Sequence, residues 1–434
     1  MDNNPLSQFH TPASDWFARA LGEPTPVQAA AWPVIASGGH TLVSAPTGTG
    51  KTLSAFFVFL DRLKAEARAG TLTEELRLIY VSPLKSLAGD IRENLRRPLD
   101  GISQTERRLG AASPDCPFDI SAAVRTGDTT AAERRRMIKH PPHILITTPE
   151  SLYLLLTSVS GQKLLKTARA VILDELHALI NTKRGAHLML SLARLDTLCG
   201  KPLQRIGLSA TIRPLSLAAE YLSPEPVTIA APDAQKTVEL TVISPFPKGG
   251  VLPQGTIWPE LARAVLEACS GARTAIAFTE GRMHAEKLAY YVNELAGEDF
   301  ARTHHGSVSK DRRAETENAL RAGTLRLLCA TSSMELGIDV GAIDVVLQIG
   351  CPRGVSSALQ RLGRAGHTPG GVSVMKIFPR TASEGLYCGL TARAARDGGI
   401  EPARPPELCL DILAQHLVSM TVCGAYTVDD VTAL

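Results

Sequence analysis

The sequence lacks the signatures of several protein classes. Its eight cysteines form no C-x-x-C pair, so their spacing indicates neither a zinc ribbon nor an iron–sulfur cluster, and it does not indicate a disulfide framework. No apolar run approaches the ~18 residues that span a bilayer. The first residues lack the basic and apolar regions of a signal peptide. We therefore expect a cytoplasmic protein that makes no membrane contact.

A strong charge of either sign is also lacking. The chain has 46 Lys and Arg against 43 Asp and Glu, which gives a formal net charge of +3. Because this balance creates no global field, any contact with nucleic acid must come from local patches. Nor is any tract biased enough in composition to indicate disorder. With 434 residues the chain is too long for one hydrophobic core, and we expect two or three domains.

The chain is organised around residues 42–52. A short apolar run ends in the glycine-rich turn Thr47-Gly48-Thr49-Gly50, and Lys51-Thr52 then opens an amphipathic helical stretch. Glycine lacks the Cβ atom that would keep the backbone from wrapping around a polyphosphate, so successive N–H groups can point at the anion. In such a loop Lys51 contacts the β- and γ-phosphates and the Thr52 hydroxyl binds Mg²⁺. The pattern predicts a nucleotide-binding site. The alternative is an ordinary glycine-rich turn before a lysine, and the first motif position is Ala45 instead of glycine.

Short apolar strands alternate with helical patterns from residue 40 to residue 212. This alternation is typical of a parallel α/β sheet, in which ligands bind at the carboxyl ends of the strands. The expected strands are residues 40–44, 78–82, 144–148, 170–173 and 203–208.

A second alternation follows a change in composition. Prolines punctuate residues 223–255, where only 238–243 alternates like a strand, so we expect a domain boundary there. Strand patterns then recur without a second phosphate loop, at residues 274–278, 325–330, 345–349 and 372–378. Residues 402–434 contain one helical pattern and are too short to form a domain. The expected parts are a domain at 1–222, a linker region at 223–255, a domain at 256–395 and the incomplete start of another domain at 396–434.

Two segments are expected to complete the nucleotide site. Pro26 suits the first turn of a helix with Thr25 as its N-cap, which would hold Gln28 near the phosphate loop, where its amide can pair with an adenine edge. A plain capped helix is the alternative. The apolar strand 170–173 delivers Asp174 and Glu175 at its carboxyl end. Asp174 can hold Mg²⁺, and Glu175 can orient and deprotonate the attacking water.

The order of these segments resembles the first motor lobe of a superfamily 2 helicase. The segments are Thr25-Pro26-Val27-Gln28, Ala45 to Thr52, Ser82-Pro83-Leu84-Lys85-Ser86-Leu87, Arg125-Thr126-Gly127-Asp128, Thr148-Pro149-Glu150-Ser151, Asp174-Glu175-Leu176-His177 and Ser209-Ala210-Thr211. The second half continues the match with His304-His305-Gly306-Ser307, Ala330-Thr331-Ser332-Ser333-Met334-Glu335-Leu336-Gly337-Ile338-Asp339 and Gln360-Arg361-Leu362-Gly363-Arg364-Ala365-Gly366-His367. These last motifs most resemble the Lhr (large helicase-related) branch of DNA-dependent helicases. The chain departs from the family's motifs at two positions. One is Ala45, and the other is His367, where many relatives carry a third arginine.

The resemblance implies an α/β fold with two tandem RecA-like parallel-sheet domains and the start of a C-terminal winged-helix domain. It implies ATP and Mg²⁺ as cofactors, with Gly337 and Asp339 among the nucleotide-binding residues. It also implies 3′-to-5′ movement on single-stranded DNA, with unwinding of DNA or RNA:DNA duplexes in DNA repair. Because the sequence stops just inside the winged helix, we expect an excerpt or a truncated gene product in which strand separation is weak or absent.

A first lobe with a phosphate site and a second lobe without one suggest that the second lobe acts on the bound nucleotide in trans. Arg364 lies in a glycine-bounded loop and is expected to be the arginine finger, whose loss costs ~10³ to 10⁵ in turnover. Arg361 and Gln360 are expected to complete that face. The alternative is that these arginines only solvate a helix.

Small hydroxyl and cationic side chains follow several of the expected strands. Such groups grip phosphates and sugars without reading sequence, so binding should be sequence-tolerant and salt-sensitive. Helix capping is the alternative role for each hydroxyl. The expected nucleic-acid contacts are Ser82, Lys85, Arg125, Thr148, Ser332 and Ser333.

Other functions stay open at this point. The chain could be an RNA helicase of the same superfamily, a translocase that hydrolyses ATP without unwinding, or a truncated nucleic-acid-binding fragment without turnover. The complete set of Lys51, Asp174, Glu175 and Arg364 favours an enzyme. His304 and His305 lack carboxylate or cysteine partners at metal-ligand spacing, so the sequence does not indicate zinc.

Overall fold

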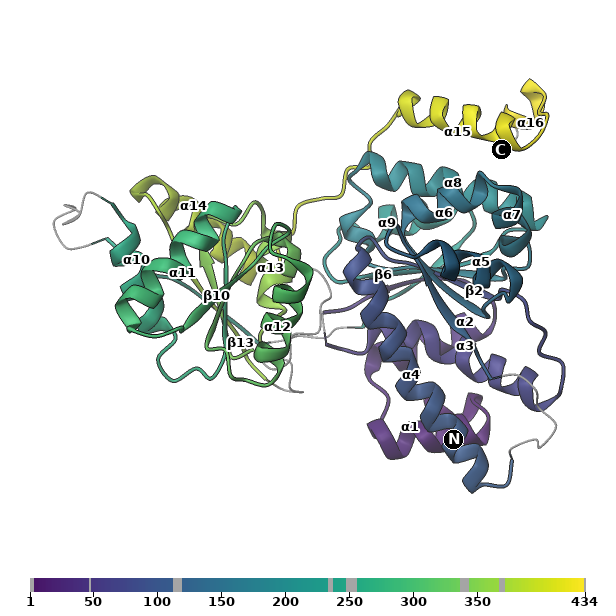
Figure 1. Cartoon of the computed structure of the whole chain (residues 1–434), viewed down its shortest axis with the longest axis horizontal. Helices are drawn as coiled ribbons and strands as arrows, with labels where there is room; N and C mark the ends of the chain where they lie inside the picture. Colours follow the sequence, from purple (N-terminus) through teal and green to yellow (C-terminus); the bar gives the residue numbers. More distant parts are fainter. Residues whose placement is uncertain are drawn as a thin grey trace. The chain divides into compact units, whose positions relative to one another are not determined.

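The chain forms two compact units, the first containing most of residues 1–233 together with 402–434 and the second most of 234–401 (Figure 1). This computed structural model describes residues 4–46, 48–111, 119–232, 237–246, 256–335, 343–366 and 371–432. Among these residues, no helix is both long and apolar enough to cross a membrane.

A seven-stranded sheet forms the centre of the first unit, in the order β3-β4-β2-β5-β6-β1-β7, and every neighbouring pair is parallel. The strands are β1 (His40–Ser44), β2 (Leu78–Val81), β3 (Ala122–Arg125), β4 (Ile144–Thr147), β5 (Ala170–Leu173), β6 (Gln204–Ser209) and β7 (Val227–Ala230). The predicted parallel α/β sheet is confirmed. Strands β3 and β7 were not predicted, because their side chains are largely half-buried or exposed and so lack a clear apolar pattern.

Helices cover both faces of this sheet because its side chains alternate between two cores. Leu78 and Tyr80 of β2 belong to one cluster, whereas Ile79 and Val81 belong to the other. The first face packs against α1 (Thr11–Leu21), α2 (Pro26–Ala36), α3 (Lys51–Arg68) and α4 (Lys85–Arg108), after a 3-10 turn, η1 (Pro5–Gln8). The second packs against α5 (Ala131–Lys139), α6 (Pro149–Leu156), α7 (Val159–Leu165), α8 (Lys183–Cys199) and α9 (Leu215–Leu222), with the 3-10 turn η2 (Leu176–Ala178) following β5.

Aromatic rings fasten the first two helices to the phosphate-loop helix α3. The rings of Phe9, Trp16, Phe17, Trp32 and Phe57 lie with centroids 4.6 to 6.3 Å apart, mostly edge to face. Such pairs add to the stability that area burial alone provides. The N-terminal segment is therefore part of the core that holds α3 in place.

The second unit is built on a six-stranded parallel sheet in the order β10-β11-β9-β12-β13-β8. Its strands are β8 (Val238–Val242), β9 (Ala275–Phe278), β10 (Ala301–His304), β11 (Leu327–Ala330), β12 (Val345–Ile349) and β13 (Ser373–Phe378). Its helices are α10 (Trp258–Ala268), α11 (Arg282–Ala296), α12 (Lys310–Arg321), the 3-10 turn η3 (Ser332–Met334), α13 (Val355–Leu362) and α14 (Ala382–Arg396).

The predicted linker region 223–255 supplies an edge strand to each sheet. Strand β7 pairs with β1 of the first sheet, and β8 pairs with β13 of the second. The passage from one unit to the other therefore lies between two paired strands, inside the region where prolines predicted a boundary.

The last helices, α15 (Leu410–Cys423) and α16 (Val428–Thr432), belong to the first unit. Arg194 of α8 donates to Ser419 Oγ at 2.8 Å, and Tyr153 of α6 donates to the Gln415 carbonyl at 3.3 Å. The C-terminal segment is thus anchored to the same face of the first sheet that α6 and α8 cover.

Candidate nucleotide site and nucleic-acid edge

The loop between β1 and α3 has the backbone that the glycine pattern predicted. Gly48 and Gly50 have φ angles of 84° and 83°, in the left-handed region that side chains with a Cβ rarely adopt. Thr47 lies outside the described residues. Lys51 begins α3, and its Nζ donates to the Ala45 carbonyl at 2.5 Å, so the ammonium lies back across the loop. The N–H groups at the α3 N-terminus and this cation together make an anion-binding corner.

The N-terminus of α2 abuts this loop, as the sequence predicted. Thr25 and Gln28 form a capping box, and Thr25 Oγ1 donates to the Thr49 carbonyl at 2.9 Å. A Cβ atom on Gly50 would lie 2.6 Å from Gln28 Nε2, so glycine is required for this close approach. The Gln28 side chain is 4% exposed and its Oε1 accepts from the Thr25 N–H. Its contact with an adenine edge stays a prediction.

Asp174 lies at the carboxyl end of β5 with a donor on each of its carboxylate oxygens. Oδ1 accepts from the Glu175 N–H at 2.9 Å, and Oδ2 accepts from the Tyr80 hydroxyl. Burial and the neighbouring Glu175 carboxylate raise the pKa of Asp174 to about 7, while Lys51 acts in the opposite direction. Two carboxylates held this close in a buried corner form a place where a cation would be stabilised.

Glu175 is connected to the next strand through His177. Glu175 Oε2 lies 3.3 Å from His177 Nε2, and His177 Nδ1 lies 3.1 Å from Ser209 Oγ. Because Nδ1 also accepts from the Ala210 N–H, the neutral ring carries its proton on Nε2, facing the carboxylate. His177 lies within the motif Asp174-Glu175-Leu176-His177, but the sequence predicted no role for it. Its partners come from β6, so only the strand order reveals them.

The residues predicted to bind Mg²⁺ match what that ion prefers. Thr52 offers a hydroxyl and Asp174 a carboxylate, both oxygen donors. In the part of the chain that the structure describes, no cluster of three His, Cys, Asp or Glu side chains could hold a metal ion by itself. An ion that takes most of its ligands from phosphates and water fits such a sparse donor set.

Arg361 and Arg364 of the second unit are buried in a hydrogen-bond network around Glu335. Arg361 Nη2 donates to Glu335 Oε2 at 3.0 Å and Nη1 donates to Gln348 Oε1 at 2.5 Å, while its guanidinium lies over the Phe278 ring. Arg364 Nη2 donates to the Glu335 carbonyl at 3.1 Å. These side chains are therefore not solvating a helix surface, which was the alternative.

Other predicted residues of this unit are placed more simply. Gln360 Nε2 donates to Ser356 Oγ at 3.2 Å, and Ser332 opens the turn η3 directly after β11. Gly337, Asp339 and His367 lie outside the described residues, as does the side chain of Ser333. Glu335, which accepts hydrogen bonds from both arginines, lies within the motif at residues 330–339, but the sequence predicted no role for it.

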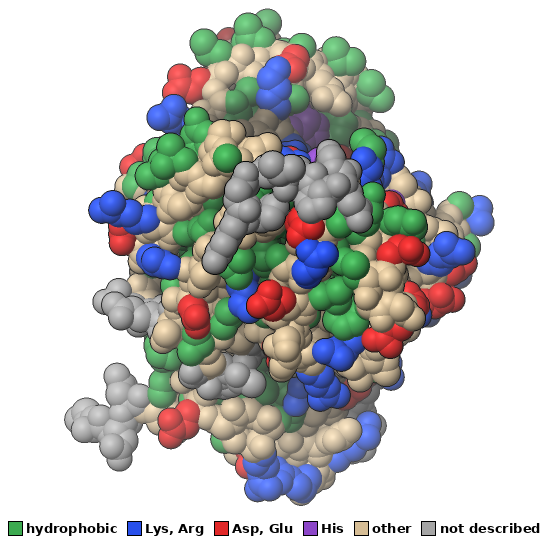
Figure 2. Space-filling model, turned by 90° about the vertical axis from the view of Figure 1, so that its left-hand side faces the viewer, with side chains coloured by type: hydrophobic (Ala, Val, Ile, Leu, Met, Phe, Trp, Pro, Cys, Tyr) green, Lys and Arg blue, Asp and Glu red, His purple; other side chains and the backbone are tan. Residues whose placement is uncertain are grey.

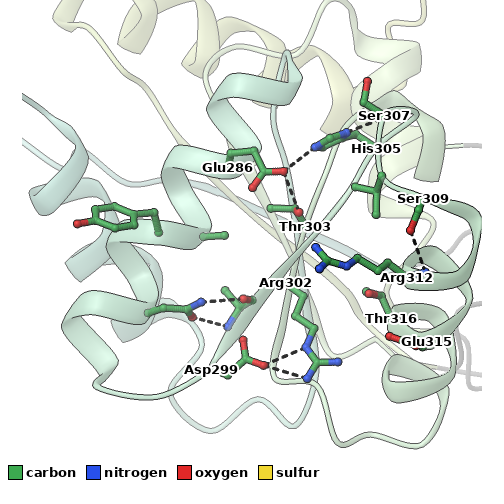
Figure 3. A pocket seen from close by; sticks show the side chains of 15 residues that line it. Glu286, Asp299, Arg302, Thr303, His305, Ser307, Ser309, Arg312, Glu315 and Thr316 are labelled. Carbon is green, nitrogen blue, oxygen red and sulfur yellow. Dashed lines mark hydrogen bonds and ion pairs between the residues drawn. The ribbon is translucent and has the colours of Figure 1, made fainter.

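Two histidines of this unit have carboxylate partners that their spacing in the sequence did not suggest. His304 Nε2 lies 3.0 Å from Glu317 Oε1, and His305 Nε2 lies 2.7 Å from Glu286 Oε1. His305 and Glu286 line a cavity of about 770 Å³ between α11, the edge strand β10 and α12 (Figure 3). Arg302 in the same cavity pairs with Asp299 at 2.9 Å. The lining of this cavity therefore mixes acidic and basic side chains.

The profile of DEAD/DEAH box helicases matches residues 25–218, and the profile of the helicase conserved C-terminal domain matches 260–368. The "Lhr helicase/ probable uracil glycosylase" of Mycolicibacterium smegmatis is 43% identical over 96% of this chain and 30% of its own length. The "ATP-dependent helicase Lhr-Core" of Methanocaldococcus jannaschii is 39% identical over 96% of this chain and 49% of its own length. A structure of the Mycobacterium smegmatis helicase Lhr bound to ssDNA and AMP-PNP superposes with a TM-score of 0.90, at 44% identity, over 99% of this chain and 55% of that one.

The chain belongs to the Lhr-like branch of the superfamily 2 helicases. It spans less than half of the length of these curated relatives, since the covered shares are 30%, 31% and 49%. The predicted tandem RecA-like fold is thereby confirmed for both sheets.

In this Lhr-like chain, three of the predicted nucleic-acid residues follow adjacent strands. The sheet order β3-β4-β2 places Arg125, Thr148 and Ser82 side by side at one carboxyl edge. Thr148 also caps α6 by accepting from the Ser151 N–H, and Ser82 is buried. The exposed Lys85 lies 3.1 Å from Asp128.

The Lhr-like chain shows no field of one sign on the face drawn in Figure 2, where Lys and Arg lie among Asp and Glu. This agrees with the nearly balanced composition. Any attraction for a nucleic-acid backbone must come from short-range contacts, such as those predicted at the carboxyl ends of the strands.

Proposed function

We propose that this chain is the motor core of an ATP-dependent helicase that moves 3′ to 5′ on single-stranded DNA and separates DNA or RNA:DNA duplexes in DNA repair. The observation that carries the proposal is the corner where Lys51 lies across the phosphate loop and the Asp174-Glu175 pair ends β5, with Glu175 connected through His177 to the end of β6. Relatives with ATP-dependent helicase names, and a neighbour bound to ssDNA and AMP-PNP, support it.

Each residue of the corner has a role in hydrolysis. The loop N–H groups and Lys51 hold the β- and γ-phosphates, and Glu175 orients and deprotonates the attacking water. Thr52 and Asp174 would hold Mg²⁺, which neutralises charge on the phosphate oxygens when it is bound. Arg364 is assigned the arginine-finger role, since the Glu335 carbonyl accepts a hydrogen bond that orients its guanidinium.

The link from Glu175 to Ser209-Ala210-Thr211 supports coupling between hydrolysis and the strand edge. A change at the γ-phosphate that shifts Glu175 would shift His177, which contacts both Ser209 and Ala210. Such coupling biases an equilibrium between two arrangements of the motor.

Steady-state ATP hydrolysis tests the proposal, measured without nucleic acid, with single-stranded DNA and with matched single-stranded RNA. We expect stimulation by DNA, and a loss of stimulated turnover of ~10³-fold or more in Arg364→Ala. Glu175→Gln should abolish turnover and retain ATP binding.

Three results would argue against the proposal. Stronger stimulation by RNA would favour an RNA helicase, and stimulated hydrolysis without displacement of an annealed strand would leave a translocase. Turnover that persists in Glu175→Gln would mean that this carboxylate is not the base.

A further inference from the structure

Tyr80 stands out in β2 because a hydroxyl-bearing ring lies among aliphatic side chains in the middle of the sheet. Its side chain is fully buried and its ring stacks on Phe56 of α3, with centroids 5.0 Å apart and planes tilted by 23°. Phenylalanine would fill the same space against Phe56. A buried phenol is costly unless its hydroxyl finds a partner, so the hydroxyl needs its own explanation.

The partner is the carboxylate at the end of the neighbouring strand. Strands β2 and β5 pair in parallel with Val81 opposite Leu173, so Asp174 extends just past the strand end. Tyr80 lies one residue before that end, on the same sheet face as α3, and its hydroxyl donates to Asp174 Oδ2.

The two donors on Asp174 fix the plane of its carboxylate. Tyr80 holds Oδ2 and the Glu175 N–H holds Oδ1 at 2.9 Å. Each carboxylate oxygen has two lone pairs, so one on each oxygen stays available for a metal ion or its water. The hydroxyl therefore orients the group without blocking it.

We propose that Tyr80 is a positioning residue for Asp174 and thereby sets the affinity of the nucleotide site for Mg²⁺. The inference rests on the proposed function in one respect, namely that Asp174 takes part in holding Mg²⁺ with the nucleotide. Partners that orient a metal ligand are each worth ~10- to 100-fold in metal affinity or activity.

The variant Tyr80→Phe removes this hydrogen bond and keeps the ring contact with Phe56. The matched control is Tyr221→Phe in α9, because the Tyr221 hydroxyl is also buried in the first unit and has no hydrogen-bond partner among the described residues. Both variants lose one buried hydroxyl, but only the first loses a donor to a carboxylate.

Two readouts are needed, both as a function of Mg²⁺ concentration. One is DNA-stimulated hydrolysis at saturating ATP, and the other is binding of a fluorescent non-hydrolysable ATP analogue, which does not depend on turnover. For Tyr80→Phe we expect the half-saturating Mg²⁺ concentration to rise ~10- to 100-fold in both assays. Turnover at saturating Mg²⁺ should change much less, and Tyr221→Phe should match the wild type. Thermal unfolding checks whether both variants are folded.

Distinct outcomes separate this inference from the proposed function. A folded Tyr80→Phe protein with the wild-type Mg²⁺ dependence overturns the role of Tyr80 alone. Wild-type protein that binds the analogue with Mg²⁺ but never hydrolyses ATP overturns the proposed function, while the binding assay still decides on Tyr80. Wild-type protein whose analogue binding ignores Mg²⁺ overturns both. Equal Mg²⁺ shifts in Tyr80→Phe and Tyr221→Phe would point to general loosening of the lobe and also overturn the inference.

Discussion

Glu175 adopts a backbone conformation that residues other than glycine seldom occupy, with φ at 48°. Such a conformation costs of order 1–3 kcal/mol and persists only where the surroundings hold it. Here the surroundings are the Asp174 carboxylate, which accepts from the Glu175 N–H, and the His177 ring, which faces its side chain. At the scale of single residues, Asp174 and His177 therefore fix the orientation of the Glu175 carboxylate.

The variant His177→Gln tests whether His177 orients the Glu175 carboxylate. Removing the imidazole leaves Glu175 without the group that connects it to Ser209 and Ala210, and a misplaced reacting group can cost ~10²-fold. We expect kcat for ATP hydrolysis to fall by about that factor, with little change in KM. His140→Gln is the control, because His140 is exposed and pairs with Glu74 at the surface. A wild-type kcat in His177→Gln would contradict the role of His177.

At the scale of elements, α4 packs closely against α1 where Gly101 meets Trp16. A Cβ atom on Gly101 would lie 1.9 Å from the indole nitrogen of Trp16, which is a rigid ring within the aromatic cluster. The two helices can approach this closely only because residue 101 has no side chain.

The variant Gly101→Ala is expected to destabilise the first unit. Alanine gains up to ~1 kcal/mol in helix propensity, but overpacking against a rigid neighbour costs ~1–3 kcal/mol. We expect a lower thermal unfolding midpoint. Gly89→Ala in the same helix is the control, because a Cβ there meets nothing within 4 Å, and it should raise the midpoint. If both variants are stabilised, the close approach of the two helices does not require glycine at position 101.

The attachment of α15 should depend on pH. His416 is buried against α8, where Nδ1 accepts from Arg194 Nη1 at 3.3 Å and Nε2 has no hydrogen-bond partner among the described residues. Burial, then His187 and Arg194, lower the pKa of His416 from 6.5 to about 4. The detached helix therefore binds a proton more readily, so docking is strongest above pH 6.5 and weakens as the pH falls toward 4.

Amide hydrogen exchange in residues 410–423 measures this attachment. After correction for intrinsic rates, protection is expected to be lower at pH 5 than at pH 7.5. The variant His416→Phe keeps an aromatic ring and cannot titrate, so its protection should vary less between the two pH values. Equal protection of the wild type at both values would show that His416 does not control the contact.

At the scale of the whole molecule, a net charge of +3 leaves the proposed DNA binding to local groups. The carboxyl edge formed by β3, β4 and β2 carries Arg125, with Lys85 just beyond β2. For single strands the logarithm of the binding constant falls with the logarithm of salt concentration by about 0.7 per phosphate contact.

The variant Lys85→Ala should weaken DNA binding equally for different base sequences. It should also reduce the slope of the logarithm of the binding constant against the logarithm of salt concentration by the amount that one phosphate contact contributes. Fluorescence anisotropy with two oligonucleotides of unrelated sequence, over a range of salt concentrations, measures both effects. Lys201→Ala is the control, since Lys201 precedes β6 and so lies toward the opposite edge of the same sheet. A change for only one oligonucleotide would contradict backbone binding.

The sequence by itself determined the phosphate loop, the Thr25 N-cap of α2, and two parallel α/β sheets, because each depends on neighbours within a few residues or on a repeated apolar pattern. The tertiary structure alone decided contacts across strands. Tyr80 meets Asp174, His177 meets Ser209, and Glu335 holds Arg361 and Arg364. These partners are far apart in the chain, and parallel strand order brings them together, which no local pattern encodes.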